Sequence, residues 1–253
     1  RESSLELPAW ATCGESSDPL PAFSHKPSRQ SIRPGTFEQL LQIAKLRGIR
    51  PGALLIAQHR GVLVFGRSFD YEVWGVTDQS QNVLEYRRID GLPFPAYGKL
   101  DERKSHSIRH SKKTWPVGIL EAKDSPCIAL VEGLPDFLAC HDVVLRETAY
   151  PVCAPVAMMS ASPGIKAEAL HYFRGKTVRI FPHVDESGAG YVGARKWQQQ
   201  IESVGAIKVD IFDFTKVEKI AGVTCHDLND FLRVCDDSLL NRFPCLNSIL
   251  PRP

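Results

Sequence analysis

Residues 127–136 read Cys-Ile-Ala-Leu-Val-Glu-Gly-Leu-Pro-Asp, and this stretch decides the fold class of the 253-residue chain. Its first five residues form an uninterrupted apolar run, which is typical of a strand buried on both faces of a parallel sheet. Because proline is tolerated in the first turn of a helix, the residues after Gly133 predict a helix over 134–145. We therefore expect a strand that runs directly into a helix, with Glu132 at the end of the strand.

The same alternation of strand and helix continues toward the C-terminus. Apolar runs predict further strands at Val152–Met158, Thr177–Phe181 and Lys208–Phe212. Helical periodicity predicts helices at Ile165–Phe173, Gly190–Val204 and Asp227–Val234. Alternating strands and helices with apolar strands predict a parallel sheet that helices cover on both faces.

Upstream of residue 122 the hydrophobic pattern is different. Thr36 and Gln39 have the spacing of a capping box, which predicts a helix that ends at Gly48, and a second short helix is expected over 51–59. Short strands over 62–65, 72–77 and 82–87, with a turn at 78–80, favour an antiparallel-rich subdomain. The predicted α/β chain therefore has a linker or leader (1–35), a small mixed basal subdomain (36–122), a Rossmann-like domain with a mainly parallel sheet (123–235) and a tail (236–253).

The composition excludes several classes of protein. Hydrophobic residues make up 43% and charged residues 24% of the chain, which is typical of a folded domain and not of a disordered or fibrous one. No apolar run reaches the roughly 18 residues of a spanning helix, so no membrane partner is expected. The seven cysteines are irregularly spaced, which favours a reducing, cytoplasmic location over a disulfide framework. The chain begins with Arg1, as a piece of a longer protein would.

Acidic residues lie where the carboxyl ends of the predicted strands meet. Glu132 ends the first strand, Asp185 follows the third, and Asp227 and Asp230 follow the fourth. Asp136 is on the first turn of the helix after Glu132. Carboxylates at one edge of a sheet suit Mg²⁺ or Mn²⁺, which prefer oxygen ligands. Helix capping is the better explanation of each acid taken alone, but it does not explain their recurrence on successive strands.

These motifs resemble the TOPRIM domain that bacterial-type primases, topoisomerases and some nucleases share. The family has a strand ending in Glu-Gly with a nearby Asp, which residues 131–136 match, and a later strand ending in Asp-x-Asp-x-x-Gly, which residues 181–188 match with one departure. Residues 227–230 are similar to the Asp-x-Asn-Asp element that follows the domain in phage and bacterial primases. The resemblance implies that Glu132 and Asp185 are catalytic. The metal ligands that it implies are Glu132, Asp136, His183, Asp185, Asp227 and Asp230.

His183 is the departure, since the family usually has an Asp at this place. A neutral imidazole binds Mn²⁺ better than Mg²⁺. One interpretation is an altered, weaker metal site, and the other is that the remaining carboxylates, Asp227 among them, still hold the metal. We expect a site that binds metal less tightly and works better with Mn²⁺. Activity should fall below pH ~6.5, where an ordinary imidazole becomes charged.

The segment before the first parallel strand is dense in basic residues. Residues 112–122 are similar to the junction between the basal subdomain and TOPRIM in bacterial primases, and residues 87–113 hold eight basic residues against three acidic ones. By resemblance, Lys112 and one of Arg87 or Arg88 hold phosphates. The full set of candidate nucleic-acid or nucleotide-binding residues is Arg87, Arg88, Lys99, Lys112, Lys113 and Gly188.

Two further points about this basic loop stay open. Aromatic residues lie among its charges, and Tyr86, Tyr97 and Trp115 are candidates for stacking on bases. The alternative is a solvated surface loop with no ligand, since runs of Lys and Arg are often of this kind.

The resemblance implies a primase-like nucleotidyltransferase core that makes short RNA primers on single-stranded DNA with Mg²⁺ or Mn²⁺. The expected partners are single-stranded DNA, ribonucleoside triphosphates and a replicative helicase. The family's zinc-binding module and helicase-binding region are not recognisable, which implies a trimmed piece or a compact protein of a phage or mobile element. The alternatives are a TOPRIM-class metal-dependent nuclease and a non-catalytic nucleic-acid-binding module whose metal site has decayed.

Overall fold

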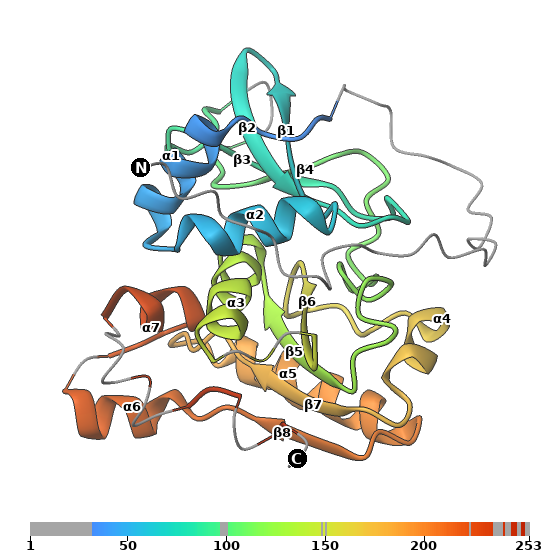
Figure 1. Cartoon of the computed structure of the whole chain (residues 1–253). Helices are drawn as coiled ribbons and strands as arrows, with labels where there is room; N and C mark the ends of the chain where they lie inside the picture. The colour runs from blue at the N-terminus through green and yellow to red at the C-terminus, as the bar shows by residue number, and fades with distance from the viewer. Residues whose placement is uncertain are drawn as a thin grey trace, which may run out of the picture.

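The computed structural model describes residues 32–96, 101–147, 149, 151–222, 224–234, 240, 244–246 and 249–250. Within these residues, a basal subdomain with an antiparallel sheet precedes a larger part built on a parallel sheet (Figure 1). This arrangement confirms the predicted α/β class. The domain boundaries at residues 122 and 235 stay predictions. No helix among the described residues is long and apolar enough to span a membrane.

The basal subdomain packs two helices against a four-stranded sheet of order β1-β2-β3-β4. Thr36 and Gln39 form the predicted capping box, and Gly48 ends the first helix in the left-handed conformation, with φ at +69°. Arg33 forms an antiparallel β-bridge with Phe65, so the chain joins this sheet within the stretch predicted as a linker or leader (1–35). The elements are α1 (Phe37–Arg47), α2 (Pro51–His59), β1 (Leu63–Ser68), β2 (Tyr71–Val76), β3 (Glu85–Arg88) and β4 (His106–Ser107).

The second sheet is parallel throughout and has the order β6-β5-β7-β8. Its core strand β5 is buried except at its last residue, as the apolar run predicts. The strands and main helices are β5 (Cys127–Glu132), α3 (Leu134–Arg146), β6 (Cys153–Met158), α4 (Ala167–Leu170), β7 (Thr177–Phe181), α5 (Ala189–Ser203), β8 (Lys208–Ile211), α6 (Phe214–Ala221) and α7 (Leu228–Val234).

The strand order creates a switch point between β5 and β7. The chain moves outward from β5 to β6 in one direction and from β7 to β8 in the other, so right-handed connections place α3 and α5 on opposite faces of the sheet. Figure 1 agrees, with α5 behind the strands and α3 on the side of the basal subdomain. Ligand sites of open parallel sheets lie at such a switch point, beyond the carboxyl ends of the strands.

A few elements differ from those that the sequence predicts. The strand expected at 82–87 starts only at Glu85, and the helix expected at 165–173 is the short α4 followed by a 3₁₀ turn over 171–173. The prediction missed β4, which has two residues, and α6. Helix α6 does have a local signal, because Asp213 accepts hydrogen bonds from the amide and hydroxyl of Thr215 in its first turn.

Helices α2 and α3 pack side by side and join the two parts of the molecule (Figure 1). Arg50 Nε lies 2.6 Å from Oδ1 of Asp142, whose side chain is fully buried. On the other side of the junction, Trp115 Nε1 donates to Asp78 Oδ2 over 2.8 Å, and the amide of Gln79 donates to Glu121 over 2.9 Å. The Arg50–Asp142 contact fixes the basal subdomain to α3, and the contacts of Trp115 and Glu121 hold the segment that leads into β5 against the turn at 78–79.

Candidate metal and nucleotide site

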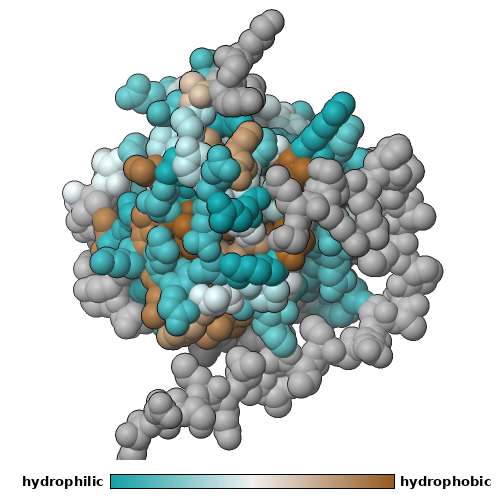
Figure 2. Space-filling model, turned by 90° about the horizontal axis from the view of Figure 1, so that it is seen from above, coloured by the Kyte–Doolittle hydropathy of each residue, from teal (hydrophilic) through white to brown (hydrophobic). Residues whose placement is uncertain are grey.

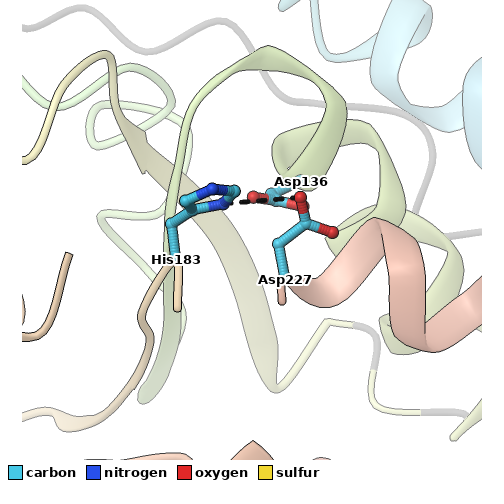
Figure 3. A group of neighbouring side chains, drawn as sticks. All are labelled: Asp136, His183 and Asp227. Carbon is cyan, nitrogen blue, oxygen red and sulfur yellow. Dashed lines mark ion pairs between the residues drawn. The ribbon is translucent and has the colours of Figure 1, made fainter. Parts of the chain in front are cut away.

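Three of the predicted ligands converge at the switch point. One ligand atom from each of Asp136, His183 and Asp227 lies within 4.8 Å of the others, and Figure 3 shows the side chains pointing toward one another. Asp136 is on the first turn of α3, His183 follows β7, and Asp227 immediately precedes α7. Asp136 and His183 therefore meet because β5 and β7 end at one edge of the sheet, and α7, which packs against α3, brings Asp227 to them.

The loop that carries His183 is held from two sides. The amide of Val184 donates to the carbonyl oxygen of His226 over 2.6 Å, which ties the end of β7 to the segment before α7. Helix α5 begins directly against the same loop, since a Cβ atom on Gly190 would lie 1.8 Å from the carbonyl oxygen of His183. Only glycine allows this approach, so Gly190 helps to place His183.

His183 forms an ion pair with Asp227, with Nδ1 3.5 Å from Oδ2. The hydrogen bond to Asp227 raises the pKa of His183 to about 9, although partial burial opposes the shift. Burial raises the pKa of Asp227, but the hydrogen bonds from His183 and the Asp230 amide outweigh it and leave the pKa lowered. The imidazole is thus charged at neutral pH in the metal-free protein. The expected fall in activity below pH ~6.5 assumed an ordinary imidazole bound to a metal ion, and it stays a prediction.

Burial raises the pKa of two acids of the site, Asp136 and Glu132. Asp136 is buried, and its Oδ1 accepts the backbone amide of Asn229 over 3.0 Å. Burial, and next the charge of Asp227, raise the pKa of Asp136 well above its usual value. Burial also raises the pKa of Glu132, with His183 opposing. The Oε2 atom of Glu132 is buried and has no hydrogen-bond partner among the described residues.

Asp185 and Asp230 lie outside the group of three. Asp185 accepts the Ser187 hydroxyl over 2.8 Å and the Ala189 amide over 3.2 Å, at the start of α5, and the Ser187 hydroxyl contributes most to its lowered pKa. The amide of Asp230 donates to Asp227 Oδ1 over 2.7 Å, which makes Asp227 the cap of α7. Both acids therefore serve helix starts as well as bordering the site.

The predicted phosphate-binding residues are spread over two regions. Arg87 on β3 is half-buried, and burial lowers the pKa of its guanidinium, while the charges of Glu85, Asp136 and Asp227 oppose the shift. The guanidinium of Arg88 pairs with Asp90 and lies 3.8 Å from the ring centre of Tyr71. Lys112 is exposed, and Lys113 pairs with Glu85 over 3.1 Å.

The last two predicted phosphate-binding residues are Gly188 and Lys99. The amide of Gly188, which has a φ of +70°, donates to the Asp185 carbonyl over 3.1 Å. Lys99 lies outside the described residues.

The sequence analysis missed Arg47 and Arg103. Together with Arg87 they line a cavity of about 370 Å³, which we call the arginine pocket; its other lining residues are Arg88, Gly91, Leu92, Pro93, Glu102 and Lys104. Within the described residues, the Nε atoms of Arg47, Arg87 and Arg103 are buried without a hydrogen-bond partner. Three unsatisfied guanidinium donors around one cavity are arranged for an anion with several acceptor oxygens.

Arg47 also connects the pocket to the acids. Burial, and next the charges of Arg87 and Arg233, lower the pKa of Arg47 to about 10, while Asp227 and Asp136 oppose the shift. The guanidinium therefore stays charged at neutral pH. Its only signal in the sequence is a basic residue at the end of a helix, which is common because it suits the helix dipole.

Comparison with known proteins supports the fold. No protein-family model matches the chain, and no curated protein is similar to it in sequence. The structure is similar to that of the primase fragment of the bacteriophage T7 primase–helicase protein, with a TM-score of 0.52 and 15% identity over 89% of this chain and 81% of that one. The chain has the fold of a phage-type primase core. At 15% identity the likeness shows the fold of this primase-like core and leaves its activity to be proposed.

A second solved structure also matches most of the chain. It holds the bacteriophage T7 lagging-strand DNA polymerase interacting with primase domains that are bound to an RNA/DNA hybrid and dTTP. The match has a TM-score of 0.49 and 18% identity, over 78% of this chain and 87% of the other chain. The assignment of the fold therefore depends on the T7 primase fragment.

Proposed function

We propose that the chain is a nucleotidyltransferase core that synthesises short RNA primers on single-stranded DNA with a divalent metal ion. The observation that carries this proposal is that the arginine pocket lies beside the group of Asp136, His183 and Asp227, which we call the acidic group. Asn229 joins the two, because its amide donates to Asp136 Oδ1 over 3.0 Å and its side chain donates to the carbonyl oxygen of Arg47 over 2.8 Å, although Arg47 and the acids come from different subdomains. A nucleoside triphosphate needs this pair of features, cationic donors for its phosphates and carboxylates for the ion that accompanies them.

The acidic residues fit a divalent ion. The group of Asp136, His183 and Asp227 offers three ligand atoms, and the buried, unsatisfied Oε2 of Glu132 supplies a further oxygen donor. When bound, the ion would neutralise the charge that develops during phosphoryl transfer. His183 is protonated in the metal-free protein, so an ion that uses it as a ligand would have to displace this proton, and a nitrogen donor would then favour Mn²⁺ over Mg²⁺. In the proposed reaction Arg47 and Arg87 orient the triphosphate, and Glu132 Oε2 accepts the proton of the attacking hydroxyl. The hydroxyl oxygen bonds to the α-phosphorus, and the bond from that phosphorus to the leaving pyrophosphate breaks.

Incubation with single-stranded DNA, labelled ribonucleotides and either Mg²⁺ or Mn²⁺ tests the proposal. Labelled oligomers of a few nucleotides support a primase, whereas shortened DNA supports a TOPRIM-class nuclease. The Glu132→Gln protein is the matched control, because a contaminating polymerase or nuclease would keep its activity in that sample. Absence of both products with the wild-type protein would contradict catalysis by this core.

One observation favours a second function. The charged His183 imidazole pairs with Asp227 in the middle of the acidic group and supplies positive charge there without a metal ion. A site in which the charge of His183 partly neutralises the carboxylates suits a non-catalytic module that binds nucleic acid. Binding of single-stranded DNA that neither Mg²⁺ nor Mn²⁺ alters, together with absence of product, is the result that this function predicts.

A further inference from the structure

The turn between β1 and β2 holds a phenylalanine in a conformation that phenylalanine rarely adopts. Phe69 is the first of the two residues between the paired Ser68 and Tyr71, and its φ is +55°. Two-residue hairpin turns usually have Gly or Asn where φ is positive, because a larger side chain is strained there. The turn alone therefore does not explain a bulky ring at this position, and such strain is typical of functional sites.

The ring of Phe69 is accessible, and its neighbours hold it in place. Its exposed fraction is 48%, whereas Phe94 beside it is 1% exposed. The centroid of the Phe69 ring lies 6.2 Å from that of Phe94 and 5.2 Å from that of His106. Phe94 and His106 are themselves in edge contact, with centroids 6.0 Å apart. The result is a small aromatic surface with a buried base and an accessible outer ring.

Arginine side chains border this aromatic surface. The guanidinium carbon of Arg103 lies 5.9 Å from the ring centre of Phe69, and Arg103 also lines the arginine pocket. The aromatic surface therefore continues into the pocket that lies beside the acidic group. Figure 2, which looks down on the basal end of the molecule, shows hydrophobic positions scattered among hydrophilic ones and no broad apolar face. An accessible ring beside an arginine suits a polyanion with flat apolar groups better than the apolar core of a protein interface.

We propose that Phe69, His106 and Arg103 form a stacking site for a base of single-stranded nucleic acid, next to the arginine pocket. Bases stack on aromatic faces with little regard to sequence, while arginine neutralises the phosphates between them. The choice of ligand rests on the proposed function, but the site is separate from the acidic group. It replaces two stacking candidates of the sequence analysis, since Tyr86 and Trp115 are both buried. The third, Tyr97, lies outside the described residues.

Fluorescence anisotropy with a labelled oligo(dT) strand tests this site. Phe69→Asn suits the left-handed turn, so the variant should unfold thermally at or above the wild-type temperature, yet bind roughly tenfold more weakly. Its affinity should keep the wild-type dependence on salt, because stacking releases no counterions. Arg103→Ala should instead lower the slope of log affinity against log salt by about 0.7, the value for one phosphate on a single strand. Phe69→Trp keeps a stacking ring and should retain the affinity.

Phe37→Ala is the matched control, because Phe37 is similarly exposed, at 54%, but lies on α1. Wild-type affinity in the folded Phe69→Asn protein would overturn the stacking site and leave the proposed function intact. A lowered salt slope in that variant would also overturn it, because the loss would then be electrostatic. A wild-type protein that does not bind the strand at all would overturn the site and the single-stranded DNA partner together.

Discussion

Asn229 donates a hydrogen bond from its side-chain Nδ2 to the backbone carbonyl oxygen of Arg47 over 2.8 Å. Its own backbone amide donates to Oδ1 of Asp136 over 3.0 Å. A single buried residue therefore connects the arginine pocket of the basal subdomain with the acidic group at the end of the parallel sheet. Arg233, one turn later on α7, adds a second contact of this kind by donating to the carbonyl oxygen of Leu46.

Asn229→Ala should weaken both the fold and the use of nucleotide. The change leaves the carbonyl oxygen of Arg47 without its donor, and an unsatisfied buried group costs about 1–3 kcal/mol. Urea unfolding should show a loss of this size, and the KM for ribonucleotides should rise because Arg47 is no longer held. Gln199→Ala, at an exposed position of α5, is the control. Equal stability and equal KM in both variants would remove Asn229 from this role.

Glu132→Gln should abolish primer synthesis while the protein stays folded. The amide keeps the volume of the side chain but removes the charge from the buried Oε2 position, and with it the proposed metal and proton acceptor. Product formation and thermal unfolding measured on the same preparation check both statements. Glu202→Gln on α5 is the control, and it should keep full activity. Normal turnover by Glu132→Gln would mean that this edge of the sheet is not the active site.

Gly190→Ala should displace the loop that carries His183 or the start of α5. The added Cβ would lie 1.8 Å from the carbonyl oxygen of His183, so the loop or the helix has to shift, and overpacking of this kind costs about 1–3 kcal/mol. Gly52→Ala is the matched control, because its Cβ would make an ordinary contact at 3.5 Å with Leu145. We expect lower stability and lower activity only in the Gly190 variant. Equal melting temperatures of the two variants would contradict the close packing of α5 against His183.

The ion pair of His183 and Asp227 should give stability that depends on pH. The folded-state pKa of His183 is raised to about 9, so its contribution is complete below the unfolded value near 6.5 and is lost as the pH rises through about 9. Urea unfolding of the metal-free protein between pH 6 and 10 should show this loss. His183→Asn should remove this part of the pH dependence. A wild-type curve that matches the variant throughout this range would show that the pair contributes nothing.

The parts of the fold that local patterns control agree with the sequence. Strand β7 has the predicted bounds because its apolar run ends at Pro182, and the capping box at Thr36 forms as its spacing predicts. The meeting of Asp136 and His183 was also predictable, since both follow strands of one parallel sheet. Neither inference needed knowledge of how the two parts of the molecule pack.

The features that the sequence did not predict depend on that packing. Arg47 reaches the acidic group only because α7 packs against the end of α1, through hydrogen bonds between residues more than 180 positions apart. The charge of His183 depends on its distance from Asp227, and the exposure of Phe69 depends on which rings surround it. Long-range geometry of this kind leaves no periodicity or spacing in the sequence.

The central claim is that the arginine pocket and the acidic group form one nucleotide site. Calorimetric titration of a ribonucleoside triphosphate with Mn²⁺ into the wild-type protein, Arg87→Ala, Asp136→Asn and the double variant tests it most directly. If both groups hold the same nucleotide, each single change weakens binding and their effects are not additive, as is usual for residues that share a ligand. Wild-type affinity in either single variant, or strictly additive losses in the double variant, would contradict a shared site.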